Sequence, residues 1–298
     1  MAGLKEIRRR LQSVKNTRKI TYAMKLVSAA KLNKSEAAVK SARKYTNAIN
    51  ALLADLSSEQ RDTQLSHPLL EAHENVKNIR VLVIGGSKGL CGGYNVNINR
   101  RVEAFLAEKA GSEVNIEWQL IGRKPAEYFR RIGRPALSTL EQLPDNVERW
   151  PLNEICTELE TDYQSGRIDE VYLLFTRFKS AMSVKAEVEK LLPLEASSTG
   201  AAESADGAVQ ESRLKTIFEP SAQAVFSAIV PVILRCKLRQ AALDAKTSEF
   251  GSRMTAMDSA TRNADDLITR LQLFHNKLRQ GGITSELLDI IGGAEALK

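Results

Sequence analysis

The sequence predicts an α/β fold in which N- and C-terminal helices form a long antiparallel coiled coil around a central α/β domain. Three observations predict it. A helical pattern without Gly or Pro runs from Leu4 to about Leu56, and a second runs from about Pro231 to Gln280 with a single internal Gly251. Between them, strand and helix patterns alternate, which returns the chain toward its start. The two long helices are therefore expected to run in opposite directions.

The first helix carries apolar residues in more than one register. Residues with 3-4-3 spacing share one stripe of a helix, and such a stripe begins near the N-terminus. The next apolar group is out of step with it. At 1.5 Å per residue this first helix is about 80 Å long. Register shifts change the winding of a coiled coil, so an irregular, curved helix pair is expected. The stripe is Leu4, Ile7, Leu11 and Val14, and the out-of-step group is Ile20, Ala23, Met24, Val27 and Ala30.

The second helix has a more regular pattern. Its apolar stripe keeps 4-3 spacing, and its small residues, Thr261 and Ala264, would let a partner helix approach closely. His275 falls on this stripe, where a packed side chain is preferred over a metal ligand. The stripe comprises Phe250, Met254, Met257, Thr261, Ala264, Ile268, Leu271, His275 and Leu278.

The middle of the chain alternates between strand and helix patterns, which favours a small, largely parallel sheet flanked by helices, of the Rossmann-like type. Strands are predicted at Arg80–Gly85, Asn115–Gly122, Glu170–Thr176 and Val184–Leu192, and helices at Val96–Lys109, Lys124–Ile132 and Leu152–Ser165. The predicted division is 1–60 for the N-terminal helix, 76–195 for the α/β domain, 196–212 for a flexible polar loop and 220–298 for the C-terminal helix.

Positive charge is concentrated in the first helix. Residues 1–56 hold thirteen Lys or Arg against Glu6, Glu36 and Asp55, an excess of ten where the whole chain carries +7. Such a helix favours an acidic neighbour: a nucleic acid, an anionic lipid surface or an acidic protein surface. A solvated face is the alternative, but Lys and Arg also lie between the apolar positions, which favours enclosure by a partner.

Composition argues against several classes of protein. Cys91, Cys156 and Cys236 are widely spaced and form no CxxC pair, so neither a disulfide framework nor a structural zinc site is expected. The sequence contains no uninterrupted run of 18 apolar residues, so no membrane-spanning helix is expected. Neither a secretory signal nor a transit segment is expected.

A glycine-rich loop, GGSKGLCGGYN from Gly85 to Asn95, lies between a predicted strand and a predicted helix. This order of elements can hold a phosphate on backbone N–H groups. The loop has neither the GxxxxGK[ST] order nor a clean GxGxxG, so a turn or protein-contact loop is preferred, with a nucleotide site as the alternative. Cys91 has no His close to it in the sequence, which argues against a nucleophile. No catalytic residue, metal or cofactor is predicted.

Four blocks of sequence occur together: LKEIRRRLQSVKNTRKITYAMKLVSAAKL, GLCGGYN, SEFGSRMTAMDSATRNADDLI and ITSELLDIIGGAEAL. In this order, in a chain of this length, they resemble the gamma subunits of F-type ATP synthases. One departure is Gly86-Ser87-Lys88, where the family usually has Ser-Asp followed by Arg or Lys, so a contact made by that Asp is not expected. No inserted cysteine pair is visible, so thiol switching by that route is not expected either.

The resemblance implies a non-catalytic rotor shaft that couples proton flow to ATP synthesis or hydrolysis. The implied partners are the alpha and beta subunits of the catalytic head, the epsilon subunit and the c-subunit ring, with no nucleic acid. Membrane association would come only through the complex, at the cytoplasmic face of a bacterial plasma membrane. Contacts with alpha and beta are implied at Met24, Lys25, Lys88, Cys91, Arg279, Gln280 and Thr284, and a bearing tail at Ile283, Leu287, Leu288 and Ile291. Ordinary coiled-coil packing is the alternative role for Met24 and the tail.

Two other classes of function remain open at this stage. A nucleic-acid-binding coiled coil would use the same basic helix, but only Tyr22 and Tyr45 supply aromatic rings there. Salt-dependent DNA binding by the isolated chain would favour it. A nucleotide-dependent enzyme would use the glycine-rich loop, and undetectable nucleotide affinity would remove that possibility.

Overall fold

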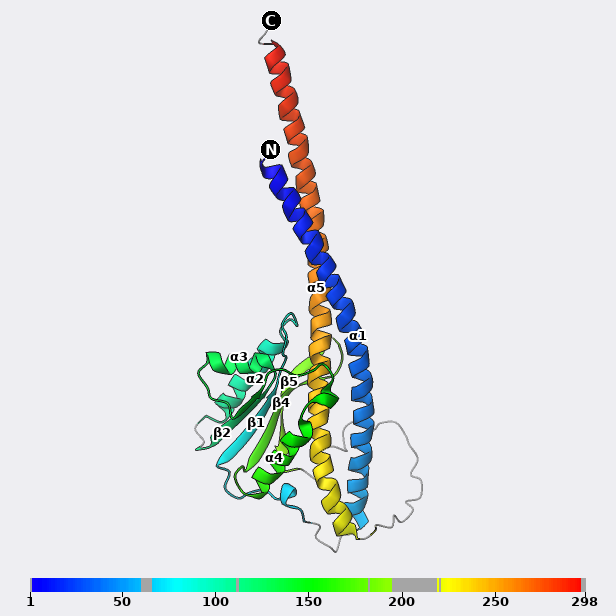
Figure 1. The fold of residues 1–298 in the computed structure, drawn as a ribbon, viewed down its shortest axis with the longest axis vertical. Coiled ribbons are helices and arrows are strands. Elements are labelled where there is room, and N and C mark those ends of the chain that lie inside the picture. The colour runs from blue at the N-terminus through cyan, green and yellow to red at the C-terminus, as the bar shows by residue number, and fades with distance from the viewer. Residues whose placement is uncertain are drawn as a thin grey trace. The chain divides into compact units, whose positions relative to one another are not determined.

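A computed structural model describes residues 2–59, 66–110, 113–181, 183–194, 219 and 221–295 of the chain. The chain divides into two compact units: unit 1 is Met1–Ala30 with Arg253–Lys298, and unit 2 is Lys31–Ser252. Two long helices, α1 (Ala2–Glu59) and α5 (Ala222–Glu295), contribute to both units (Figure 1). The predicted polar loop at 196–212 lies outside the described residues.

Unit 2 contains a five-stranded sheet in the order β3-β2-β1-β4-β5. The first four strands in the chain are parallel, and β5 is antiparallel to β4, so the predicted largely parallel sheet is confirmed. Every predicted strand is present, but β3 was not predicted. The bounds are β1 (Asn78–Ile84), β2 (Asn115–Ile121), β3 (Ser138–Leu140), β4 (Glu170–Phe178) and β5 (Val184–Leu192).

Helices cover both faces of this sheet (Figure 1). Alternate side chains of a strand point to opposite faces, and β1 shows the consequence. Ile79, Val81 and Val83 pack with α2 and α3, whereas Leu82 and Ile84 belong to a second core with α4 and parts of α1 and α5. The sheet is therefore the middle of three layers. The bounds are α2 (Tyr94–Glu108), α3 (Arg123–Arg131) and α4 (Leu152–Gln164), with single 3₁₀ turns η1 (Pro68–Leu70) and η2 (Val147–Arg149).

Arg80 is the exception within the apolar strand β1. Its side chain is fully buried, and its guanidinium contacts Glu117 at 2.7 Å and Asp162 at 2.6 Å. Burial by itself would lower the pKa of Arg80, but hydrogen bonds with these carboxylates raise it, so the cation persists in the core. A buried charge is tolerated only when it is paired and hydrogen-bonded in this way.

The two long helices run antiparallel within each unit, as predicted. In unit 2, Ser35 of α1 contacts Thr247 of α5, and Arg43 further along α1 contacts Asp244 earlier in α5. In unit 1 the paired residues show the same direction: as the residue number rises along α1, the number of its partner in α5 falls. The unit 1 pairs are Arg18–Asp265 at 2.6 Å, Thr21–Thr261 at 2.9 Å and Lys25–Asp258 at 2.6 Å.

The predicted stripe of the second helix is confirmed by burial. All nine of its residues are buried or half-buried, and Ile7 and Leu278, the expected ends of the seam, are both half-buried members of unit 1. Conversely, four of the five out-of-step residues of α1 are exposed, and only Met24 is half-buried.

The helix α5 extends at both ends beyond the pattern from about Pro231 to Gln280, and it lies within the segment predicted at 220–298. α5 begins at Ala222, so Pro231 lies inside it and removes one backbone hydrogen bond. Phe226 and Val230 are buried beside it, and this burial offsets the loss. At the other end, α5 continues through Gly281-Gly282 to Glu295, although each glycine costs roughly 1 kcal/mol relative to Ala in a helix.

Candidate functional site

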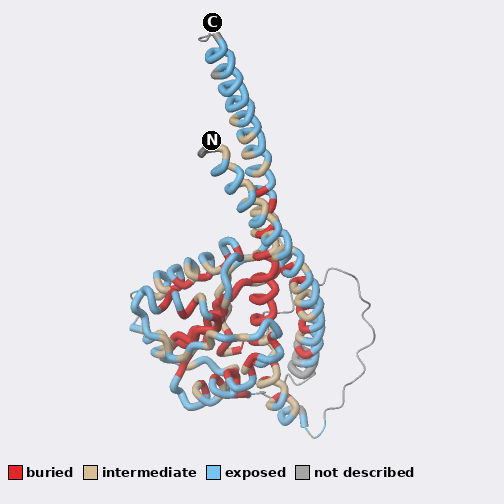
Figure 2. The backbone as a smooth tube through the Cα atoms, turned by 45° about the horizontal axis from the view of Figure 1, so that its top comes forward, coloured by how far each residue is buried: buried red, intermediate tan, exposed pale blue. Residues whose placement is uncertain are grey.

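The most unusual feature of unit 2 is a stretch of α5 in which every residue is buried. Ala241–Phe250 has no exposed face, and Figure 2 shows it as a continuous red segment of the helix. A helix enclosed on all sides is normally apolar throughout. Half of this enclosed segment is instead polar or charged: Asp244, Lys246, Thr247, Ser248 and Glu249.

The enclosed segment lies against the carboxyl ends of the central strands. The Tyr94 hydroxyl, just after the β1 loop, donates to the Ala245 carbonyl at 2.9 Å, and Ser248 Oγ donates to the carbonyl of Thr176 on β4 at 3.2 Å. At Gly251, an added Cβ would lie 3.4 Å from the Cα of Ala181, in the β4–β5 hairpin. Three separate segments, at the start of α2, at the end of β4 and in the β4–β5 hairpin, therefore approach this part of α5 closely.

This position is the topological switch point of the sheet. In the strand order 3-2-1-4, chain direction across the sheet reverses between β1 and β4, and doubly wound folds bind nucleotides in the crevice there. Here α5 contacts both the loop after β1 and the end of β4, so it occupies that crevice itself. The geometry thus favours a protein-contact role for the glycine-rich loop over a nucleotide site.

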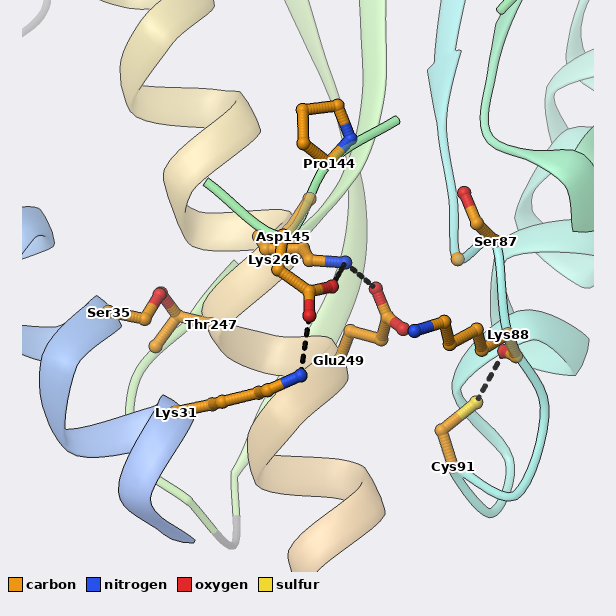
Figure 3. Close-up of polar contacts among 12 residues, drawn as sticks. Lys31, Ser35, Ser87, Lys88, Cys91, Pro144, Asp145, Lys246, Thr247 and Glu249 are labelled. Carbon is orange, nitrogen blue, oxygen red and sulfur yellow. Dashed lines mark hydrogen bonds and ion pairs between the residues drawn. The ribbon is translucent and has the colours of Figure 1, made fainter. Parts of the chain in front are cut away.

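The loop uses its polar groups within the chain. Asn95 accepts a hydrogen bond from the backbone N–H of Gly86 at 3.0 Å, and Cys91 Sγ lies 3.8 Å from the Lys88 carbonyl. Cys91 is buried, whereas neighbouring Leu90 is 63% exposed. In Figure 3 the Lys88 side chain points toward Glu249 of α5. The loop therefore faces α5 with Lys88 and presents Leu90 to the surroundings.

An ionic network ties three elements together beside this loop (Figure 3). Asp145, between β3 and α4, contacts Lys31 of α1 through Oδ2 at 2.5 Å and Lys246 of α5 through Oδ1 at 3.2 Å. Lys246 also contacts Glu249 at 3.0 Å, and both of these side chains are buried. We call Lys31, Asp145, Lys246 and Glu249 the Asp145 network.

Asp145 is held in its charged form by this network. Partial burial alone would raise the pKa of its carboxyl, but hydrogen bonds and charges from Lys31 and Lys246 outweigh that effect and lower the pKa to about 2. The side chain remains 38% exposed, so solvent screens part of the attraction. Asp145 is therefore a carboxylate at any physiological pH.

Sequence reasoning missed the Asp145 network. Its members lie in three separate stretches of sequence, and no local pattern marks Asp145. A weak signal existed in α5, where Lys246 and Glu249 are spaced i,i+3 inside an otherwise small and apolar run, as expected of a buried pair.

In unit 1 as well, some polar residues are buried while large apolar residues are exposed. The seam between α1 and α5 includes buried hydroxyl groups beside its apolar residues: Ser28 and Thr261 are 3% and 7% exposed, next to buried Met257 and Ala264. On the outside of the same stretch of α1, Ile20 is 60% and Val27 is 55% exposed. A soluble helix pair normally buries its apolar face, so these outward apolar residues form a surface suited to a further protein.

The predicted contact residues of unit 1 occupy different environments. Met24 and Lys25 are half-buried, and Lys25 forms an ion pair with Asp258. Arg279, Gln280 and Thr284 are exposed, with the Thr284 hydroxyl donating to the Gln280 carbonyl at 2.9 Å. The predicted bearing tail is exposed along its whole length: Ile283, Leu287, Leu288 and Ile291, joined by Ile290.

Two other kinds of feature are absent from the described residues. Within the described ranges, no three His, Cys, Asp or Glu residues are grouped so that they could hold a metal ion. No helix in the same part of the chain is both long enough and apolar enough to cross a membrane.

Known proteins resemble this chain along its full length. A family model described as ATP synthase matches residues 3–297. The ATP synthase gamma chain of Bdellovibrio bacteriovorus is 37% identical over 298 residues, and that of Nostoc punctiforme is 38% identical over 318 residues. Each match covers 100% of both chains.

Solved structures share the fold. A chain from the Euglena gracilis mitochondrial ATP synthase, in an OSCP/F1/c-ring structure, aligns with a TM-score of 0.63 at 17% identity, over 99% of this chain and 95% of that chain. A chain from the rotor of the same enzyme aligns with a TM-score of 0.60 at 16% identity, over 95% and 99%. From the family model and the full-length relatives, the chain belongs to the ATP synthase gamma chain family.

Proposed function

We propose that this chain is the central-stalk rotor shaft of a bacterial F-type ATP synthase. It would transmit torque between a proton-driven c ring and the catalytic head of alpha and beta subunits. Family membership supports this role, and the observation that carries it in the structure is the outward apolar surface of unit 1 around Ile20 and Val27. Neither the fold nor the relatives give any support to the nucleic-acid alternative.

The helix pair of unit 1 would lie inside the head. Complete burial of one large apolar side chain stabilises a complex by about 1.5–3 kcal/mol, so Ile20, Tyr22, Leu26 and Val27 together offer a substantial surface. Apolar contacts have no preferred direction, and so they allow a rotor to move from one partner to the next. Buried ion pairs would resist that movement, because breaking one costs about 3–5 kcal/mol.

The residues implied by the family resemblance refine this picture. Met24 and Lys25 would meet an acidic lever of beta, which would compete with Asp258 for Lys25. Exposed Arg279, Gln280 and Thr284 would form a catch contact with the head. The bearing tail would turn against the inner surface of the head through its exposed apolar side chains.

The α/β part of unit 2 would contact epsilon and the c ring. A partner contact from the glycine-rich loop would be made chiefly by Leu90, because Lys88 points toward Glu249 of α5 (Figure 3) and the Cys91 side chain is buried. The chain would then be peripheral to the cytoplasmic face of the plasma membrane, attached only through the complex. ATP hydrolysis and synthesis would take place on beta.

Co-purification combined with cysteine crosslinking tests this function. Tagged chain from native membranes should recover alpha, beta and epsilon. A cysteine at Val27 should crosslink to alpha or beta, and its matched control, a cysteine at buried Ser28, should not. Recovery of none of these subunits, together with salt-dependent DNA binding by the isolated chain, would overturn the proposal.

A further inference from the structure

We propose that Asp145 is a positioning residue that fixes the rotation of α5 about its own axis within unit 2. Torque between the α/β domain and α5 would then pass through the Asp145 network. The proposal rests on the proposed shaft function and names the residues that carry the load within this chain.

The enclosed segment needs such a contact. A torque applied to α5 acts to turn the helix within the groove that holds it. Three of the side chains packed there are Ala241, Ala242 and Ala245, and small apolar groups give non-directional contacts with a short lever arm. Long side chains with directional partners therefore add to the resistance that Leu243, Phe250 and the hydrogen bonds to Ala245 and Thr176 provide.

Lys246 is the side chain best placed to resist turning. Its ammonium contacts Asp145 and Glu249 and lies 5.0 Å from the centre of the Phe250 ring. The side chain is only 7% exposed, so it cannot move its charge into solvent as the helix turns. Of these three neighbours, only Asp145 belongs to another element of the fold.

Asp145 is itself held in place from both sides. The carbonyl of the preceding residue, Pro144, accepts a hydrogen bond from the buried Trp150 ring at 2.9 Å. The following residue, Asn146, caps η2 by accepting from the Glu148 N–H at 3.1 Å. The segment is therefore anchored to the α/β core, and its carboxylate reaches α1 and α5 from a fixed base.

A second ion pair joins the segment after β3 to α5 and differs from the Asp145–Lys246 pair in its exposure. Glu148 of η2 contacts Arg239 of α5 at 2.5 Å, but the two side chains are 51% and 43% exposed. Exposed pairs are screened and re-form easily in a new geometry. The structure thus gives one exposed and one partly buried connection between the same two elements, and it assigns the load to the second.

The Asp145→Asn variant tests this assignment in the intact ATP synthase in membrane vesicles. The substitution keeps the size of the side chain, and Lys246 retains Glu249, so the core keeps a paired charge. We expect subunit content and ATP hydrolysis to stay close to the parent complex. Protons pumped per ATP hydrolysed should fall about threefold or more, as expected when a coupled contact is lost.

Matched variants separate a positioning role from a merely structural one. Glu148→Gln should leave the pumping ratio unchanged. Lys246→Met should lower the ratio as Asp145→Asn does, and the double variant should be no worse than the more affected single variant. An unchanged ratio in assembled Asp145→Asn complex, equal losses in Glu148→Gln, or failed assembly of both Asp145→Asn and Lys246→Met would each overturn the proposal.

Failure of the shaft function itself would look different. In that case the parent chain would not co-purify with the head, and there would be no pumping ratio to compare. A parent complex that assembles and pumps, with no effect of Asp145→Asn, would remove only the role of Asp145.

Discussion

Two stretches of one helix, α5, reverse the usual relation between polarity and burial. In Ala241–Phe250 charged and hydroxyl side chains are buried, whereas in 279–294 every described side chain is exposed, including five Ile and Leu residues (Figure 2). Both stretches are regular helix. Burial along α5 therefore follows from what surrounds each stretch. The first is surrounded by its own chain, and the second is exposed, as the proposed contact with other subunits requires.

Truncating one leucine in each stretch is the strongest way to break this comparison. Leu243→Ala should lower the free energy of unfolding by about 2–5 kcal/mol, because it leaves a cavity in a packed core. Leu287→Ala, at a side chain that is 54% exposed, should change it by less than about 0.5 kcal/mol. Denaturant unfolding of the purified chain gives both values, and similar losses would refute the contrast.

The glycines of the exposed stretch give the next largest effect. Neither Gly281 nor Gly282 has an atom within 4 Å of an added Cβ, so Ala fits at both positions. The double Gly→Ala variant should stabilise the local helix by about 1 kcal/mol per residue. Amide hydrogen exchange around these residues should slow accordingly, with little change in global unfolding.

Gly251 beside the enclosed segment is the matched control for this prediction. Its added Cβ would already touch Ala181, so Gly251→Ala should show a smaller gain or none. If amide exchange slowed equally in Gly251→Ala and in the Gly281, Gly282 double variant, the contact with Ala181 would have no effect on the cost of adding a Cβ.

The pH dependence of stability tests the contact that Asp145 makes with the enclosed segment. The pKa of Asp145 is lowered from 3.8 to about 2 in the folded chain, so its carboxylate adds stability above about pH 4. After allowance for its partial exposure, that contribution is about 1 kcal/mol. The stability difference between parent and Asp145→Asn should be constant from pH 7 to about 4 and shrink as pH falls toward 2. A difference that grows in acid would contradict the assignment.

The smallest expected effect belongs to the exposed ion pair of Glu148 with Arg239. Glu148→Gln should cost less than about 0.5 kcal/mol, because exposed pairs contribute little. Urea unfolding in low salt and in high salt would show whether even this small loss disappears when the charges are screened. A salt-independent loss above 1 kcal/mol would give this pair the role that we assign to Asp145.

The periodic features of the fold were predictable from the sequence. The stripe from Phe250 to Leu278 was identified from 4-3 spacing, because a helix pair places every third or fourth residue on its seam. The strands of the sheet were recognised as short runs that alternate with helical patterns. β3 was missed, since three residues, Ser138–Leu140, are too few to show an alternation.

The candidate site was much less predictable. Arg80 interrupts an apolar strand, and the sequence does not reveal that Glu117 and Asp162 neutralise it. Likewise, Asp145 gains its role only when the fold brings α1 and α5 to its two oxygens. The partner contacts at Met24, Lys88 and the bearing tail stay predictions, because they concern surfaces of other chains.

The hydroxyl-lined seam of unit 1 has a mechanical consequence. Helices separated by Ser and Thr approach more closely than helices separated by Leu, since interaxial distance depends on the side chains at the contact. Ser28 and the Thr21–Thr261 pair are therefore expected to bring the two helices close together and to make the pair slender at this level. A slender rod twists further under a given couple, so elastic strain in unit 1 is expected to gather at these hydroxyl groups.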